Sequence, residues 1–532
     1  MSEVISTVQD HAALVQSLAR SLNADRTIET HISTVLLAGA QALKLKKPVA
    51  PGFLDFTTLR AREHFCREEL RLNRRTAATL YLDVLPVIGA LDAARLGVAT
   101  DAPHAIDWAL QMRRFDPEQG FDRRAARGEI SAHDADALAQ AVATLHLQAD
   151  CAPLESAFGT PATVRRCIEA NVAALRDGTG AAGDRARLDA LAAWCAAAIA
   201  QHASLIGRRR LHGWVREGHG DLHLANIVSV DGVPQLFDAL EFDPALRWID
   251  VIDDVAFLFM DLCERASAPL AWRLLSSYLE FTGDWGGTAL LPLYAVHRAL
   301  VRARVAELRA QQPAVAAAER LRAHAGGMHY VVLAQALAQP PALQLVVMSG
   351  LSGSGKSVVA AELAAHLHAL RVRSDVERKR LAGLPATTRG DASLYTAAMT
   401  ASTYARLAEI AGTLLDAGVS VVVDSAALKA DERVALLQVA RARQCPATIV
   451  RCEAPWPLLQ QRVAARALAR ADPSDATVDV LAQQRGWQQP RGAGEPPHVV
   501  IDTGAALAQV VAACRSLAHR MRGSDAGDER PQ

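Results

Sequence analysis

The sequence predicts two kinds of folded domain in one chain: an α+β domain first, and an α/β domain with a parallel sheet after it. The α/β prediction rests on residues 350–357, Gly-Leu-Ser-Gly-Ser-Gly-Lys-Ser, which follow a short apolar segment and precede a segment rich in Ala, Leu and Val. The α+β prediction rests on a β-rich hairpin pattern over residues 30–46 and on Ala- and Leu-rich helical segments from about residue 130.

The domain boundaries follow from these patterns. A chain of 532 residues is long enough for two to four domains. We expect the first domain to span residues 1–338 and the second to span residues 342–520, because Gln339-Pro340-Pro341 reads as a linker. The polar residues 521–532 are expected to form a disordered tail.

The overall composition argues against several classes of protein. Because 57 Lys and Arg balance 57 Asp and Glu, nucleic acid or an anionic membrane is not expected as the main partner. The eight Cys include no C-x-x-C pair, which indicates a reduced cytoplasmic protein without a zinc site. The acidic N-terminus does not read as a signal peptide, and the absence of a run of about 20 apolar residues predicts no membrane span.

The first elements are predicted from side-chain periodicity. Residues 1–28 carry apolar residues at three- and four-residue spacing, which predicts an amphipathic helix. Two β-rich segments flank Ala38-Gly39-Ala40, so residues 30–46 are expected to form a hairpin. In its second strand Lys44 and Lys46 share one face, because side chains alternate along a strand.

A helix and two further strands are expected next. The charged segment Thr57–Arg75 predicts a helix that carries Glu68 and Glu69. Tyr81–Val87 is expected to form another strand, and Asp107–Arg114 is expected either to continue the sheet or to lead out of it.

The stretch His219-Gly-Asp-Leu-His-Leu-Ala-Asn226 precedes a second hairpin pattern that ends at Asp238. A short hairpin brings its ends together, so Asp221, Asn226 and Asp238 are expected to lie near one another. One acid to orient a hydroxyl, with an Asn and an Asp to hold Mg²⁺, is a minimal set for phosphoryl transfer without a covalent intermediate. The alternative is that His-Gly-Asp forms an ordinary turn and that Asn226 caps a local element.

This stretch resembles the catalytic loop of the aminoglycoside phosphotransferase and choline kinase group, relatives of the protein kinases. The resemblance covers about residues 28–330 and implies a two-lobed, protein-kinase-like α+β domain. It implies that Asp221 is the catalytic base and that Asn226 and Asp238 are metal ligands. For His223, a structural role and a catalytic role are both open.

The same resemblance extends upstream. Lys44 resembles the strand lysine that contacts the α- and β-phosphates of ATP, and Glu69 resembles its helix partner. Two ambiguities stay open, because Lys46 shares the strand face of Lys44 and Glu68 adjoins Glu69. Asp254 is expected to brace the catalytic loop rather than to take part in the chemistry.

Residues 350–357 fit the phosphate-binding pattern G-x-x-x-x-G-K-[ST] at every fixed position. Glycines let backbone N–H groups close around phosphate oxygens, and the helix that follows points its positive end at them. Lys356 is expected to reach the β- and γ-phosphates, and the Ser357 hydroxyl to ligate Mg²⁺. An ordinary Gly- and Ser-rich turn is the alternative. The expected ATP-binding residues are Gly350, Gly353, Ser354, Gly355, Lys356, Ser357 and Val358.

Two acidic residues are expected near this loop. Asp375 lies where the second strand of a doubly wound sheet ends, so it would bind an acceptor hydroxyl while Arg378 or Arg380 binds a phosphate. A role for Asp375 as a helix N-cap is an equal alternative. Asp424 ends an apolar strand pattern and fits a Walker B position beside Mg²⁺, with capping of the next turn as the alternative.

Arg462, Arg466 and Arg470 recur at four-residue spacing, which places them on one helical face. Residues 342–520 as a whole resemble small P-loop kinases, among them gluconate kinases, polynucleotide kinases and zeta-type toxins. This resemblance implies an arginine lid over the transferred phosphate, with Arg466 as a catalytic residue. A purely solvated helix face is the alternative.

The two halves together resemble a bacterial family of bifunctional aminoglycoside phosphotransferase-like and P-loop (AAA-type) ATP-binding proteins. That resemblance implies an ATP- and Mg²⁺-dependent phosphotransferase with two nucleotide sites and a hydroxyl-bearing small molecule as acceptor. Two alternatives stay open. The first domain would be a non-catalytic sensor or regulator of the second, or the protein would be a toxin-like kinase that acts on a macromolecule.

Overall fold

The computed structural model describes residues 5–50, 54–178, 182–312, 315–386, 388, 390, 392–469 and 476–523. The chain forms two compact units. The first contains Met1–Ile130, Thr144–Cys167 and Ile199–Asp261, and the second contains Ser131–Ala143, Ile168–Ala198 and Leu262–Gln532. Most of the tail predicted from residue 521 lies outside the described residues.

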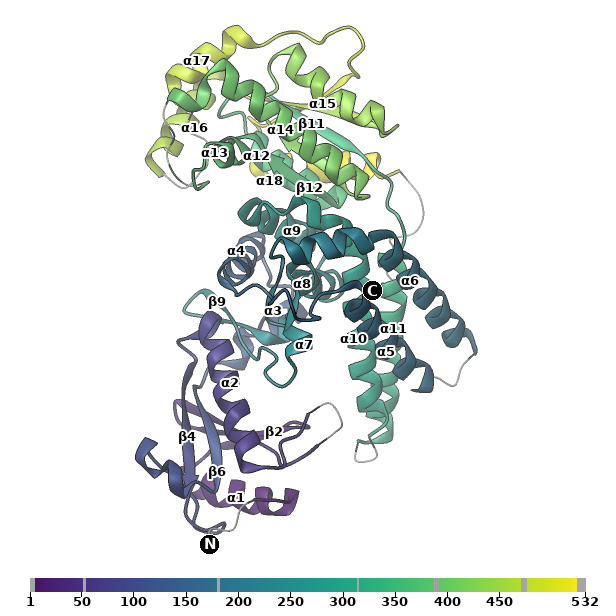
Figure 1. Cartoon of the computed structure of the whole chain (residues 1–532). Coiled ribbons are helices and arrows are strands. Elements are labelled where there is room, and N and C mark those ends of the chain that lie inside the picture. Colours follow the sequence, from purple (N-terminus) through teal and green to yellow (C-terminus); the bar gives the residue numbers. More distant parts are fainter. Residues whose placement is uncertain are drawn as a thin grey trace. The chain divides into compact units, whose positions relative to one another are not determined.

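The first unit is organised around a six-stranded antiparallel sheet with the strand order β1-β2-β3-β6-β4-β5. Helix α2 packs against β6 and β4 (Figure 1). The predicted hairpin is confirmed as β2 and β3, and the predicted charged helix as α2. The strands and helices of this region are α1 (Val8–Ser21), β1 (Arg26–Glu29), β2 (Ser33–Ala38), β3 (Gln41–Lys46), α2 (Leu59–Ala77), β4 (Tyr81–Ile88), β5 (Arg95–Leu96), η1 (Ala99–His104) and β6 (Asp107–Arg113).

The prediction of one helix over residues 1–28 is wrong in its last part. Helix α1 ends at Ser21, and β1 pairs with β2, with Arg26 opposite Leu37. All four residues of β1 are exposed, so no alternation of buried and exposed side chains marks this segment as a strand in the sequence. It forms because the open edge of β2 supplies backbone hydrogen-bond partners.

The rest of the first unit holds the stretch around His219. Strand β7 (Val215–Glu217) pairs with β10 (Trp248–Asp250), and β8 (Ile227–Val230) pairs with β9 (Val233–Leu236) as the predicted hairpin. The short helices here are η2 (Pro117–Gln119), α3 (Phe121–Ala126), η3 (Leu224–Asn226) and α7 (Pro244–Arg247).

The helical segments expected from residue 130 are present. Helices α10 and α11 pack against each other in the second unit. The helices of this part of the chain are α4 (Ala132–Gln148), α5 (Pro161–Gly178), α6 (Ala182–Leu211), α8 (Val251–Arg265), α9 (Ala268–Thr282), η4 (Trp285–Leu290), α10 (Leu291–Ala310) and α11 (Ala317–Leu337).

The second unit contains a five-stranded parallel sheet with the order β12-β13-β11-β14-β15, which confirms the predicted fold class. Helices α12 and α18 pack together, as do α14 and α15 (Figure 1). The strands are β11 (Leu345–Ser349), β12 (Ala369–Arg373), β13 (Ser420–Asp424), β14 (Ala447–Glu453) and β15 (His498–Asp502). The helices are α12 (Lys356–Leu367), α13 (Ser374–Leu381), η5 (Ala392–Tyr395), α14 (Ala397–Asp416), α15 (Ala430–Ala442), α16 (Trp456–Ala469), α17 (Val478–Trp487) and α18 (Leu507–Met521).

One helix of the described chain is long and apolar enough to pass a hydropathy test for a membrane span. It covers Gly183–Leu211, and only a minor share of its most apolar stretch is buried. The sequence had predicted no membrane span, because it contains no run of about 20 apolar residues. A single helix of this kind is weak support for a span, since core helices of soluble proteins pass the same test.

A buried ion pair joins α2 to the sheet of the first unit. The Arg62 guanidinium donates from Nε to Asp107 Oδ1 at 2.7 Å, and both side chains are fully buried. Arg62 also donates to the backbone carbonyls of Ile5 and Phe56 at 3.2 and 3.0 Å, so the charge is surrounded by acceptors. Removing one partner of such a pair leaves an uncompensated buried charge.

We therefore predict that Asp107→Ala destabilises the first unit by about 3–5 kcal/mol. The measurement is amide hydrogen exchange of the full-length protein at increasing urea concentrations, followed in the peptides that contain α2 and β6. Asp25→Ala is the matched control, because Asp25 pairs with Arg114 while half exposed, and its loss costs less than about 1 kcal/mol. Equal losses for the two variants would contradict the prediction.

Candidate active sites

The phosphate-binding loop lies between β11 and α12, as the sequence predicts. Gly350 and Gly353 have φ of 147° and 79°, and a Cβ at either would lie 2.7 Å from a backbone carbonyl oxygen, that of Cys452 or of Leu459. Gly355 has φ of 74° and lies against Thr503. These positions need glycine because the loop turns in the left-handed region and packs directly on β14 and α16.

Side chains from distant segments hold the loop in place. Thr503 Oγ1 donates to the carbonyl of Ser354 at 2.8 Å. Arg462 donates to the carbonyls of Gly353 and Thr503 at 3.4 and 2.8 Å. The Ser352 N–H donates to Gln484 Oε1 on α17 at 2.8 Å. The contacts of Thr503 and Gln484 cannot be predicted from the motif, because both residues are remote from it in the sequence.

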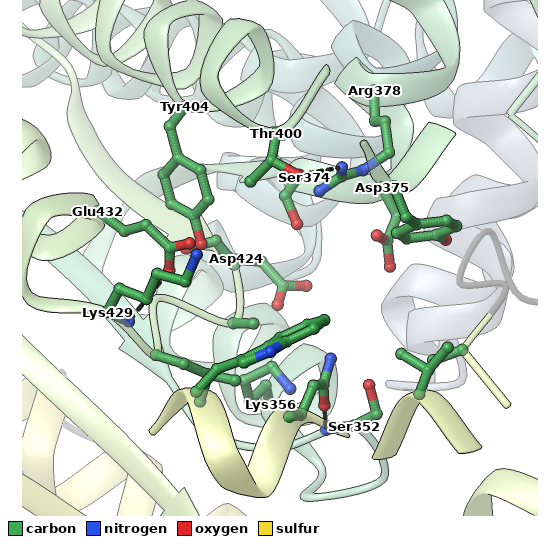
Figure 2. Close-up of a pocket in the computed structure, with 18 of the residues that line it drawn as sticks. Ser352, Lys356, Ser374, Asp375, Arg378, Thr400, Tyr404, Asp424, Lys429 and Glu432 are labelled. Carbon is green, nitrogen blue, oxygen red and sulfur yellow. Dashed lines mark hydrogen bonds between the residues drawn. The ribbon is translucent and has the colours of Figure 1, made fainter. Parts of the chain in front are cut away.

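A cavity of about 590 Å³ opens beside the loop and brings several of the predicted residues together. Figure 2 shows Lys356, Asp375 and Asp424 around this space. Ser357 and Arg466 also line it. Side chains that the sequence analysis did not associate with the site complete the wall, and they include Arg373, Tyr395, Thr400, Tyr404 and Trp487.

Lys356 and Asp424 are the central charges of this cavity. Lys356 Nζ donates to the carbonyl of Leu351 at 2.8 Å, and burial lowers the pKa of its ammonium group, an effect that the Asp424 carboxylate partly offsets. Asp424 ends β13, is 5% exposed, and its buried Oδ2 accepts no hydrogen bond from the residues that the structure describes. Asp424 and Ser357 line the same cavity, and a carboxylate together with a hydroxyl is an oxygen-ligand set that fits a divalent cation.

Asp375 is not a helix N-cap. Helix α13 has Arg373 as its N-cap residue, and Asp375 lies in the first turn and lines the cavity. Arg378 lines the cavity as well, donates to the carbonyl of Leu394 at 3.0 Å, and lies over the Tyr395 ring. Arg380, the other candidate, instead pairs with Glu377.

The predicted arginine lid is only partly visible. Arg466 lines the cavity, and its buried Nη2 has no hydrogen-bond partner within the described part of the chain. Arg462 contacts the loop backbone. Arg470 lies outside the described residues.

In the first unit, Lys44 joins the predicted helix and loop residues. Lys44 Nζ lies 2.7 Å from Glu69 Oε1 and 2.6 Å from Asp238 Oδ1. Burial lowers the pKa of Lys44, but Asp238 and Glu69 outweigh it and raise the pKa well above its usual value. The structure therefore places Glu69 against Lys44, whereas Glu68 contacts Arg71 and Arg247.

Lys46 belongs to the same cluster. Its Nζ lies 2.7 Å from Glu69 Oε2 and pairs with Glu241 as well. Burial alone would raise the pKa of Glu69, but Lys44 and Lys46 lower it to about 2. Glu69 is thus a fully buried carboxylate shared by two lysines. The role of Glu241 was missed, because no local pattern pairs it with Lys46.

The catalytic-loop candidates also meet. Asn226 Nδ2 donates to Asp221 Oδ2 at 2.9 Å, and His223 Nε2 lies 3.3 Å from the same oxygen. The Phe237 N–H donates to the carbonyl of Asn226 at 2.9 Å. The residue that precedes Asp238 is therefore hydrogen-bonded to Asn226. The structure thus brings Asp221 and Asn226 into contact, and the predicted hairpin leads from Asn226 to Asp238.

The bracing role expected for Asp254 is confirmed. Its carboxylate accepts the N–H groups of His219 and Gly220 at 2.6 and 3.0 Å. Helix α2 holds the segment that follows Asp238, since Asn73 Oδ1 accepts the N–H of Ala239 at 2.9 Å. Asp238 itself has a left-handed φ of 62°, and its N–H donates to Tyr81 Oη at 3.1 Å.

Comparison with known proteins identifies the family. The chain is 31% identical over 470 residues to uncharacterized proteins of Mycobacterium tuberculosis and Mycobacterium bovis, an alignment that covers 86% of this chain and 90% of each relative. The chain belongs to the same family as these bacterial proteins. Residues 345–491 match the family model of an AAA domain, which contains the phosphate-binding loop. The nucleotide-binding P-loop domain recognised from the sequence is thereby confirmed.

Solved structures show weaker likenesses. A choline/ethanolamine kinase family protein from Mesorhizobium loti is 13% identical and covers 62% of this chain and 99% of its own, with a TM-score of 0.38. A gluconokinase from Sinorhizobium meliloti is 22% identical and covers 34% of this chain and 95% of its own, with a TM-score of 0.26. At these identities and TM-scores, neither likeness supports a statement about the activity of this chain.

The geometry of the loop predicts the effect of Gly353→Ala. The new Cβ would collide with the carbonyl oxygen of Leu459 at 2.7 Å while φ is 79°, so the loop has to move. We expect ATP affinity at this site to fall by about tenfold or more, since such strain costs on the order of 1–3 kcal/mol. The measurement is a binding titration with a fluorescent ATP analogue. The signal of this site is the part of the fluorescence change that is lost in the Lys356→Ala variant.

Gly207→Ala is the control for this experiment. Gly207 lies inside α6, and a Cβ there meets nothing within 4 Å. The change should raise thermal stability slightly, because Ala is the better helix former by up to about 1 kcal/mol, and leave affinity unaltered. Unchanged ATP affinity in Gly353→Ala would contradict the predicted role of the loop.

Proposed function

We propose that the protein is an ATP- and Mg²⁺-dependent phosphotransferase with two nucleotide sites, one in each predicted domain, residues 1–338 and 342–520. The acceptor is a hydroxyl-bearing small molecule, and the protein acts in the cytoplasm. The observation that carries the proposal is the cavity of about 590 Å³, which gathers the phosphate-binding loop, a carboxylate with an unsatisfied oxygen and the acceptor-side candidates.

In the second domain the proposed roles follow from position. Loop N–H groups and Lys356 bind the phosphates of ATP, and Arg466 offsets charge on the transferred group. Ser357 and Asp424 would hold Mg²⁺, which when bound neutralises charge on the phosphate oxygens. Asp375 lies across the same cavity, where it accepts a hydrogen bond from the acceptor hydroxyl and orients it for in-line attack.

In the first domain the proposed site uses the cluster around Lys44. Lys44 binds the α- and β-phosphates while Glu69 orients it, as the 2.7 Å contact supports. Asn226 and Asp238 would hold Mg²⁺. Asp221 accepts the proton of the acceptor hydroxyl, and the hydrogen bond from Asn226 holds its carboxylate in one orientation.

A small, uncharged or mixed-charge acceptor fits the second cavity better than a nucleic acid does. Its wall carries side chains of both charges, among them Lys429 and the neighbouring Asp431 and Glu432. A nucleic-acid site would instead show a basic stripe that neutralises several phosphates. The balanced charge of the whole chain, 57 basic and 57 acidic residues, agrees with this.

A second candidate function keeps the first domain as a nucleotide sensor without catalysis. The observation that favours it is the direct Lys44–Asp238 contact of 2.6 Å, which occupies a proposed metal ligand. Such a domain would regulate the P-loop kinase. The two candidates differ in whether Asp221 is needed for any product.

Single substitutions in the full-length protein separate these candidates. The protein is incubated with γ-labelled ATP, Mg²⁺ and a metabolite extract, and labelled products are resolved. Asp221→Asn should lower the rate of one set of products by about 10²–10⁴-fold, because a general base is lost. Lys356→Ala should abolish a different set, because phosphate binding at the loop is lost.

The control is Asp231→Asn, the same chemical change in the turn of the adjacent hairpin. Asp231 is 81% exposed and lies 3.7 Å from Arg113, so every product should form at the normal rate. Products that persist undiminished in Asp221→Asn would replace the two-site proposal with the sensor candidate. Products that persist in Lys356→Ala would show that the second domain is not a kinase.

A further inference from the structure

Lys46 is a buried lysine behind the proposed nucleotide site of the first domain. It lies two residues after Lys44 on β3, so the two side chains project from the same face of the sheet. The side chain of Lys46 is 1% exposed, whereas that of Lys44 is 15% exposed and that of Asp238 is 44% exposed. The open side of the cluster is therefore at Lys44 and Asp238. A nucleotide that enters there meets these two side chains, and the Lys46 ammonium group lies behind them.

Lys46 joins two acids from separate parts of the chain. Its Nζ lies 2.7 Å from Glu69 Oε2 on α2, and it pairs with Glu241 in the segment that follows β9. Both acids are buried, and the Glu241 carboxylate has no second ion-pair partner among the residues that the structure describes. The Phe56 ring covers the ammonium group, with its centre 5.0 Å from Nζ. A buried charge stays where its partners are, because leaving them would cost both pairing and solvation.

The Glu69 carboxylate is held from two sides. Its Oε1 lies 2.7 Å from Lys44 Nζ, and its Oε2 lies 2.7 Å from Lys46 Nζ. The terminal torsion of a Glu side chain is only weakly restricted by itself, so one contact does not fix the carboxylate plane. The second contact, from Lys46, fixes the direction in which Oε1 faces Lys44.

The same lysine tethers the segment that carries Asp238. Glu241 follows Asp238 by three residues. Between them, Ala239 donates its N–H to Asn73 Oδ1 on α2 at 2.9 Å. The segment is therefore attached to the α2 side of the cluster at two points, once through Asn73 and once through Lys46.

We propose that Lys46 and Glu241 form a positioning pair of the first nucleotide site: they hold Glu69 and the segment of Asp238 around Lys44, and so place the Lys44 ammonium group for the phosphates of ATP. The proposal rests on the nucleotide site proposed for the first domain. Neither residue of the pair contacts the nucleotide. Because the pair carries one positive and one negative charge, it acts through geometry and not through the net charge of the site.

The first test is Lys46→Met in the full-length protein. A fluorescent ATP analogue is titrated, and the signal of the first site is the part of the fluorescence change that is lost in the Lys44→Ala variant. We expect the dissociation constant to rise about tenfold or more, because Glu69 loses the contact that aims it at Lys44. Adenosine lacks phosphates, so its competition for the same signal should change little. A general loss of structure would weaken both ligands.

A double variant separates positioning from stability. Lys46→Met/Glu241→Met replaces the whole buried pair by apolar side chains, a change that is often neutral for stability, whereas removing one partner alone is destabilising. The urea concentration that opens β3 and α2 to amide hydrogen exchange should therefore fall in Lys46→Met and return close to the original in the double variant. Affinity for the ATP analogue should stay low in both, because Glu69 still lacks its second contact.

The matched control is Lys47→Met, the same chemical change one residue further along the chain. Lys47 pairs with Glu29, whose side chain is 61% exposed, and it has no printed role in the cluster around Glu69. Affinity for the ATP analogue should therefore equal that of the original protein.

Three results would overturn the proposal. The first is an unchanged affinity of Lys46→Met for the ATP analogue. The second is an equal loss of affinity for the analogue and for adenosine. The third is a double variant that regains ATP affinity together with stability, which would make the pair merely structural. If Lys44→Ala removes no signal at all, the proposed first nucleotide site itself fails, and this outcome is distinct from the other three.

Discussion

The second unit depends on one constraint: all strands of its sheet are parallel, so their carboxyl ends meet at one edge. Ser349, Arg373 and Asp424 end three strands that are far apart in the sequence but neighbours in the sheet. The phosphate-binding loop leaves from this edge and turns back to pack on β14 and α16. The Asp424 carboxylate lies at the same edge and the helix that carries Asp375 starts there, which is why a cavity forms at this edge.

The two candidate sites handle buried charge differently. In the first unit Glu69 is shared by Lys44 and Lys46, and Asp238 pairs with Lys44, so each acid has a close cationic partner. In the second unit Asp424 keeps one oxygen without a hydrogen bond from the described residues. A buried carboxylate oxygen without a hydrogen-bond donor is costly, and Arg373 Nε, 3.8 Å from that oxygen, compensates its charge only in part.

The contacts of α9 show that a helix before the predicted linker packs with the P-loop sheet. The compact units place residues 262–338 with the P-loop sheet, whereas the proline pair predicts a domain boundary at residues 339–341. Glu280 and Trp285 show what this placement means chemically, because their side chains reach β12 and α13. A linker in the sequence marks where the backbone is least constrained, and side-chain contacts can cross it.

Local sequence patterns alone were enough to predict many residues of both candidate sites. The loop glycines, Lys356 and Ser357 follow from a contiguous motif, and the Asp221–Asn226 contact follows from five-residue spacing before a hairpin. The choice of Glu69 over Glu68, the Lys46–Glu241 pair, the Gln484 contact and the Glu280–Arg373 pair came only from the tertiary structure. Periodicity reports which face of an element a side chain occupies. Which charge lies opposite depends on packing between elements distant in sequence, and no local pattern encodes that.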